Sequence, residues 1–252
     1  MIAKTHAIPI RVAAFGGTSQ IVTWLTPEFG KISTSIKGAQ RAKRVGGGQY
    51  DLGYLCELLF YERMHNGLHT FKDCTAIESR IKIRGLWQET AILSYFCLLA
   101  GSGSFPSVQS VPLYQKLLAA VRALENTQIH MQLLLWFELQ MLALHGTAPQ
   151  WKHCTICHCP PATPILIAPS AGGLICPHCN AKRGFTTYPV SAETLHLLQI
   201  LQRLQNPPSN SGALRFPVDD AIVIVGECTA LWMDIAPHAR NIAVQMAKLE
   251  LK

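Results

Sequence analysis

The sequence has no apolar run long enough to cross a membrane. A transmembrane helix needs about 20 consecutive apolar residues. The longest apolar stretches, Ala91 to Ala100 and Leu133 to Leu144, are too short or are interrupted by Glu138 and Gln140. The first residues also lack an apolar segment followed by a small-residue cleavage site, so they give no secretion signal. We therefore expect a globular, cytoplasmic protein.

Two motifs of nucleotide-processing enzymes are also missing. No Gly-x-x-x-x-Gly-Lys-Ser/Thr pattern occurs, so Gly46 to Gly48 is interpreted as a linker in preference to a phosphate cradle. No histidine is followed two residues later by glutamate, although zinc-dependent nucleobase deaminases need that pair. We expect no enzymatic activity.

Acidic residues are scarce near the N-terminus. The chain carries a net charge of +7. Up to residue 50, Glu28 is the only acid, and the basic residues are Lys4, Arg11, Lys31, Lys37, Arg41, Lys43 and Arg44. A concentrated basic excess favours an anionic partner. The N-terminal part should therefore present a positive face.

Apolar residues and cysteines, by contrast, are plentiful. A chain of 252 residues that is 49% apolar can bury one large core or two smaller ones. Without secretion, nine cysteines do not indicate a disulfide framework. Those outside the pairs described next should be reduced, with Cys56, Cys97 and Cys228 in apolar surroundings.

Four cysteines form two Cys-x-x-Cys pairs separated by eighteen residues: Cys154, Cys157, Cys176 and Cys179. Both thiolates of such a pair can reach one ion at about 2.3 Å, and two pairs complete the tetrahedral shell of a structural Zn²⁺. A redox dithiol or two disulfides are the alternatives. We expect one structural zinc per chain at these four residues.

Neighbouring side chains could replace a ligand or support one, namely Cys159, His153, His158 and His178. A filled shell leaves no position for water or substrate, and the interval between the pairs contains no Asp or Glu. This argues against a zinc-dependent hydrolase. The metal should stabilise the fold.

Residues 1–80 have the pattern of a small β barrel. Turn residues separate five short apolar runs: Ile8 to Ala14, Ile21 to Leu25, Lys31 to Ile36, Tyr54 to Tyr61 and His69 to Ile77. Asn66-Gly67 is a strong hairpin signal. Five strands in about 75 residues match an oligonucleotide-binding (OB) barrel.

Residues 81–252 show helical spacing instead. We predict helices over Leu86 to Leu99, Val111 to Leu124, Gln128 to His145, Leu195 to Leu204, Ala221 to Ile235 and Pro237 to Leu249. For Ala221 to Ile235 a strand is the alternative. Thr127, Ser191 and Asp219-Asp220 are candidate N-caps. The fold class is therefore α+β, with an OB domain at 1–80 and a helical domain at 81–252 that carries an otherwise irregular zinc-binding loop at 150–185.

A basic, glycine-containing loop follows the third predicted strand and can track a phosphate backbone. A solubilising loop without a partner is the alternative. Aromatic residues of the same region could stack on unpaired bases: Phe15, Trp24, Phe29, Tyr50, Tyr54, Phe60 and Tyr61. We expect most of them, including Trp24 and Phe60, to fill the barrel core.

Several blocks of the sequence resemble the bacterial RecO family: Arg11 to Thr23, Thr26 to Lys31, Lys37 to Arg41, Leu68 to Asp73, and Ser170 to Cys176 with the second cysteine pair. The resemblance covers most of the chain. Two features depart from the family pattern. Gly17 stands where an acidic residue is usual, and the basic loop contains less arginine.

This resemblance implies an OB barrel joined to a helical domain with a zinc element. It also implies DNA repair and recombination at the nucleoid. The activities implied are binding of single- and double-stranded DNA, annealing of complementary strands, and loading of recombinase onto DNA coated by single-strand-binding protein, with RecR as a partner. We predict phosphate contacts by Arg11, Lys31, Lys37, Arg41, Lys43 and Arg44. A zinc-stabilised protein-interaction adaptor without DNA activity is the alternative.

Overall fold

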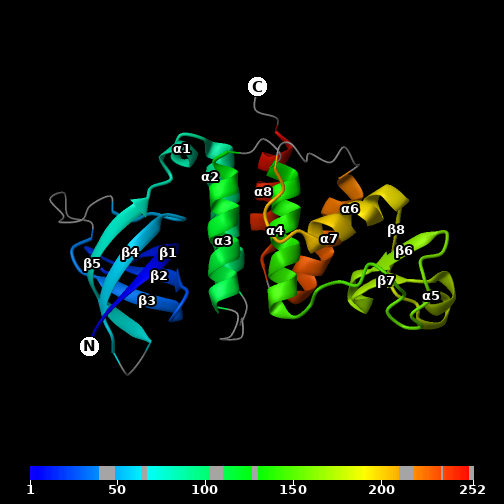
Figure 1. The fold of residues 1–252 in the computed structure, drawn as a ribbon, viewed down its shortest axis with the longest axis horizontal. Helices are drawn as coiled ribbons and strands as arrows, with labels where there is room; N and C mark the ends of the chain where they lie inside the picture. Colours follow the sequence, from blue (N-terminus) through cyan, green and yellow to red (C-terminus); the bar gives the residue numbers. More distant parts are fainter. Residues whose placement is uncertain are drawn as a thin grey trace. The chain divides into compact units, whose positions relative to one another are not determined.

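The computed structural model describes residues 1–39, 49–63, 67–102, 110–126, 130–209, 218–233 and 235–249 (Figure 1). These residues form two compact units. The first unit contains strands β1 to β5 and helices α1 to α3, and the second contains the remaining elements. In the described part of the chain, no helix is long and apolar enough to cross a membrane.

Five strands close into a barrel in the first unit: β1 (Ile2–Phe15), β2 (Ser19–Thr26), β3 (Gly30–Ile36), β4 (Leu55–Tyr61) and β5 (Leu68–Glu78). Their order is β1-β2-β3-β5-β4. All pairs are antiparallel except the short contact between β3 and β5, which closes the barrel. The predicted OB-type barrel is confirmed. β1 begins six residues earlier than predicted because its first half pairs with β4, from Ile2 opposite Tyr61 to Ala7 opposite Cys56.

Alternating side chains of the strands fill the barrel. Trp24 and Phe60 are fully buried, which confirms their predicted core role. The indole Nε1 of Trp24 donates a hydrogen bond to Oγ1 of Thr34 at 2.9 Å, so the only polar atom of this side chain is satisfied. Since successive strand residues point to opposite faces, the neighbours of these core positions face outward.

Three helices complete the first unit: α1 (Ile81–Arg84), α2 (Trp87–Gly101) and α3 (Ser110–Leu124). α2 lies against β1, and α3 lies against β2 and β3. These contacts cover apolar side chains on the outside of the barrel, since Ile8, Ile10 and Leu25 are buried although they are not part of the barrel's core cluster. Away from these helices, the outer surface of β1 to β3 includes Arg11, Thr23 and Ser33.

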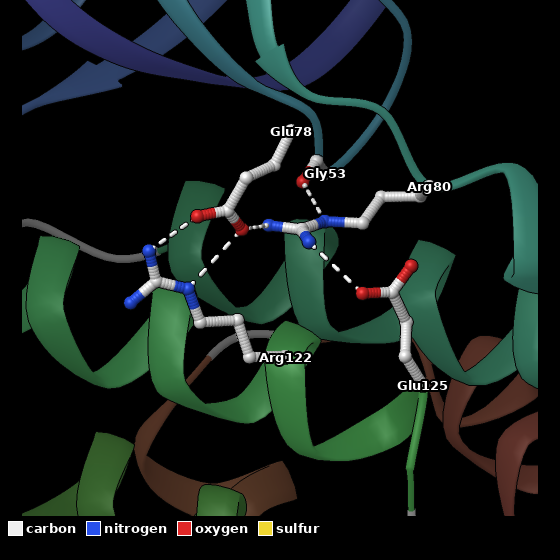
Figure 2. Close-up of polar contacts among 5 residues, drawn as sticks. All are labelled: Gly53, Glu78, Arg80, Arg122 and Glu125. Carbon is white, nitrogen blue, oxygen red and sulfur yellow. Dashed lines mark hydrogen bonds and ion pairs between the residues drawn. The ribbon is translucent and has the colours of Figure 1, made fainter.

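A buried arginine ties the barrel to α3. The side chain of Arg80 donates from Nε to the main-chain oxygen of Gly53 and from Nη1 to Glu125, both at 3.0 Å (Figure 2). Its Nη2 lies 2.8 Å from Glu78, which also accepts from Arg122 of α3 (Figure 2). This network holds α3 to the end of β5.

The second unit is built around α4 (His130–His145), which contacts the three helices α6 (Ala192–Arg203), α7 (Asp219–Trp232) and α8 (Pro237–Lys248). Residues 130–142 of α4 are all buried. Among them Glu138 is completely buried and forms a two-point ion pair with Arg240 of α8, at 2.7 and 3.0 Å. The paired geometry compensates the desolvation of the carboxylate.

The cysteine-containing region forms a three-stranded sheet of β6 (Ile165–Ala168), β7 (Gly173–Ile175) and β8 (Tyr188–Val190), in the order β7-β6-β8. A 3₁₀ turn, η2 (Pro169–Ala171), and a short helix, α5 (Pro177–Arg183), complete it. The expectation of an otherwise irregular loop is therefore wrong. Strands of three or four residues are too short to reveal an alternating pattern in the sequence.

The remaining helix predictions are largely confirmed. Ser191 caps α6, since its hydroxyl accepts from the main-chain N–H of Thr194 at 3.1 Å. The segment predicted as Ala221 to Ile235 is helix α7, not a strand. However, Asp219 and Asp220 lie in the first turn of α7, and its N-cap is Val218. Thr127, Asn66 and the triple glycine lie outside the described residues.

Candidate nucleic-acid interface and metal centre

A polar strip lies on the outer surface of β1, β2 and β3. The strand register places Arg11 opposite Thr23, and Thr23 opposite Ser33. All three side chains therefore point outward in one row. Arg11 is exposed, and the hydroxyl oxygens of Thr23 and Ser33 lie 3.2 Å apart. Guanidinium and hydroxyl groups are common donors to phosphate oxygens.

Two more predicted contacts lie at the ends of β3. Lys37 follows the strand and is exposed. The ammonium of Lys31, near the start of the strand, donates to the main-chain oxygen of Gly101 at the end of α2, at 3.0 Å. Burial lowers the pKa of Lys31. Its cation therefore already complements a helix C-terminus within the unit.

Arg41, Lys43 and Arg44 lie outside the described residues. The described residues on either side of this segment are both fixed to the barrel. Ala39 packs against the core cluster. The side-chain oxygen of Gln49 accepts from the main-chain N–H of Ala76 at 3.1 Å.

The aromatic residues of the N-terminal region divide into two groups. Four are buried in the barrel core: Trp24, Tyr50, Tyr54 and Phe60. Three are exposed, with Phe15 at 55%, Tyr61 at 44% and Phe29 at 41%. The ammonium of Lys72 lies 6.0 Å from the ring centroid of Tyr61. Sequence reasoning missed this pair because it depends on how β4 and β5 are aligned.

The basic excess is concentrated in the first unit. That unit contains 14 of the 22 Lys and Arg residues and 8 of the 15 Asp and Glu residues, which gives a net charge of +6, against +1 for the second unit. Most of the positive charge of the chain therefore lies in the unit that carries the barrel. A field of this sign raises the local concentration of polyanions.

The four predicted thiols lie together in the second unit. The Sγ atoms of Cys154, Cys157, Cys176 and Cys179 are all within 4.8 Å of one another. Cys157 is exposed, and the other three are buried. In the described part of the chain this is the only such group of His, Cys, Asp or Glu side chains, and the three neighbouring histidines are not in it.

Backbone contacts bring the two cysteine pairs together. The main-chain N–H and O of Gln150 bond to Gly172 and Leu174, at 2.9 and 2.8 Å. Gly173 lies between them at φ +139°, and a Cβ there would be 2.3 Å from the oxygen of Gln150. Only glycine permits this approach. The Gly-Gly element therefore places the segment before Cys154 beside the strand that ends at the second pair.

The local electrostatics suit a cation. Burial raises the pKa of Cys154, but N–H groups of Cys157, Cys176 and Ile156 lower it to about 6 overall. Burial and the neighbouring thiols raise the pKa of Cys179 to about 12. The cluster cannot hold four thiolates without a compensating positive charge. A set of four sulfur donors fits a thiophilic ion such as Zn²⁺.

The fold and the thiol cluster define a protein of the OB-barrel class joined to a helical unit with four cysteines that could hold a metal ion. The chain belongs to the RecO family. The family model for the N-terminal part of recombination protein O matches residues 1–80, and the model for its C-terminal part matches residues 87–220.

Curated relatives agree with this assignment. The DNA repair protein RecO of Dehalococcoides mccartyi strain CBDB1 is 31% identical over 79% of this chain and 78% of the relative. The DNA repair protein RecO of Chlorobium phaeobacteroides is 24% identical over 97% of both chains. The similarity therefore extends through both units.

Proposed function

We propose that this chain binds single- and double-stranded DNA, anneals complementary strands, and helps to load recombinase onto DNA coated by single-strand-binding protein. The observation that carries the proposal is the polar outer strip of the barrel, with Arg11 and Lys37 exposed, on a unit of net charge +6. The strand 2–3 face is also a surface through which OB folds bind oligonucleotides.

Annealing by such a surface needs no covalent chemistry. Two DNA strands repel one another through their phosphates, and cations on the protein reduce that repulsion by replacing condensed counterions. Bases that remain accessible can then pair. Exposed rings such as Phe15 and Tyr61 can hold unpaired bases by stacking before they pair.

In this proposal the metal is one structural Zn²⁺ per chain, held by Cys154, Cys157, Cys176 and Cys179. Three buried thiols and a saturated ligand set support a role in stability. The small sheet beside the cluster has strands of only three and four residues, and its buried core consists of three of these cysteines with Ala168 and Ile175. A metal supplies the missing cross-link.

RecR and single-strand-binding protein are the proposed partners, and we place their contacts on the helical half. The support is a set of exposed apolar side chains on α7 and α8, namely Val223, Leu231, Trp232 and Ile242. Val223 also lines a hollow between α7 and α8, together with Ile235 and Val244, and contiguous apolar surface of this kind marks binding sites.

A fluorescence-anisotropy titration on a labelled oligonucleotide at several salt concentrations tests the DNA-binding surface. Replacing Arg11 and Lys37 by alanine should flatten the salt dependence by about two counterion units, and replacing Arg41, Lys43 and Arg44 by up to about three. Lys4→Ala is the matched control, because Lys4 already pairs with Glu57 at 2.9 Å. Absence of wild-type binding at moderate salt would instead favour the adaptor function.

A further inference from the structure

A fifth thiol lies against the metal centre. The Sγ of Cys159 is 3.3 Å from the Sγ of Cys157. The chain reverses between these residues, because His158 has φ +59° and the main-chain N–H of Cys154 donates to the oxygen of Cys159 at 2.8 Å. The backbone of the first cysteine pair therefore holds Cys159 beside the cluster.

The four cysteines of the cluster are not equivalent in their surroundings. Cys154, Cys176 and Cys179 are buried, and their positions are fixed by the β7 strand end and by α5, whose N-cap is Cys176. Cys157 is exposed, and its Sγ contacts the Sγ of Cys159 at 3.3 Å. At the exposed position of the ligand set two thiols are therefore available, those of Cys157 and Cys159. The three buried thiols are held in place.

We propose that Cys159 is an alternative fourth ligand, so that the metal is held by three buried cysteines and by either Cys157 or Cys159. The inference rests on the metal centre proposed above. In the exchange, one metal–sulfur bond forms to Cys159 as the bond to Cys157 breaks, and the proton released by the Cys159 thiol passes to the departing Cys157 thiolate. The number of bound thiolates and the charge of the centre stay constant.

The exchange requires only a short segment of the chain to move. Cys154 stays in place, since the main-chain N–H of the next residue, Thr155, donates to the main-chain oxygen of Leu174 in β7 at 2.9 Å. Only the turn of residues 155–159 has to shift. Cys157 is exposed and Cys159 packs, partly buried, against the core cluster, so no fully buried side chain has to move. Exchange between Cys157 and Cys159 therefore disturbs few packing contacts.

The zinc content of single and double variants tests the proposal, using native mass spectrometry and competition with a chelator. We expect one zinc in the wild type, in Cys157→Ser and in Cys159→Ser, with affinities within a few-fold of one another. In Cys157→Ser/Cys159→Ser, and in the matched control Cys179→Ser, the affinity should fall by at least about 10- to 100-fold, the scale of losses at metal sites.

Cobalt substitution counts the thiolates directly, because the thiolate-to-Co²⁺ charge-transfer absorption increases with their number. Cys157→Ser should retain the absorption of the wild type, and the double variant should lose about one quarter of it. Loss of metal or of folding in Cys157→Ser to the extent seen in Cys179→Ser would overturn the proposal. So would equal metal affinity in Cys157→Ser and the double variant. A wild type without zinc would instead refute the metal centre itself.

Discussion

Arg80 and Glu125 form an ion pair, 3.0 Å between Nη1 and Oε2, at the junction of the barrel with α3 (Figure 2). The arginine is only 2% exposed and the glutamate side chain 15%. A buried guanidinium needs compensation, which this pair and the contact of Arg80 with Glu78 supply. Together with the bond from Arg122 to Glu78 they hold α3 to the barrel.

Replacing Arg80 by alanine should lower the free energy of unfolding by about 3–5 kcal/mol, because it leaves a desolvated carboxylate without its partner. Urea denaturation measures this change. Lys248→Ala is the control, since Lys248 pairs with Asp219 at the surface and should contribute at most about 1 kcal/mol. Equal effects of the two substitutions would contradict a central role for Arg80.

Glu78 should make stability depend on acid pH. Hydrogen bonds from Arg122, and then from Arg80, hold the pKa of Glu78 below its ordinary value of 4.5 despite partial burial. A lowered folded-state pKa contributes stability that is present above the unfolded value and is lost as the pH falls through the folded one. Unfolding measured from pH 6 to 2 should therefore show a smaller acid-dependent loss in Glu78→Gln. An unchanged pH profile would exclude this contribution.

Phe15→Ala should weaken binding to single-stranded DNA by about 1–3 kcal/mol, because an exposed ring at the end of β1 can stack on an unpaired base. Binding to duplex DNA should be nearly unchanged, since its bases are already stacked. Phe29→Ala is the comparison variant, because the ring of Phe29 packs edge-on against the core residue Phe60, with 5.4 Å between the ring centroids. The account of Phe15 fails if both variants lose the same affinity for single strands.

Cys176→Ala should release the metal and lower the midpoint of thermal unfolding, because the bound ion contributes directly to folding. Native mass spectrometry and a thermal melt are the measurements. Cys228→Ala provides the control, since Cys228 is buried in α7 outside the cluster and its loss should reduce stability without reducing metal content. A wild-type protein that contains no metal and is nevertheless fully stable would contradict this prediction.

Much of this molecule could be predicted from local sequence patterns. The Cys-x-x-Cys spacing identifies all four members of the thiol cluster, because the knuckle geometry is set within four residues. Ser191 was identifiable as a cap for the same reason, since its partner Thr194 is three residues away. The barrel strands are visible because each is long enough to alternate.

The features that were missed depend on contacts between distant residues. The burial of Arg80 depends on Glu125, 45 residues further along the chain. The bond from Lys31 to Gly101 spans 70 residues, so the sequence could not indicate that this cation is engaged within its own unit. The contact of Cys159 with Cys157 is local, but it depends on the left-handed conformation of His158, which a non-glycine residue rarely adopts.

A strand-annealing assay tests the proposed function most directly. Two complementary oligonucleotides, one labelled with a fluorophore and the other with a quencher, are mixed with and without bound single-strand-binding protein. The protein should accelerate annealing in both cases, and replacing Arg11 and Lys37 by alanine should reduce the acceleration while Lys4→Ala does not. Annealing no faster than the spontaneous rate, with naked and with coated strands, would contradict the account.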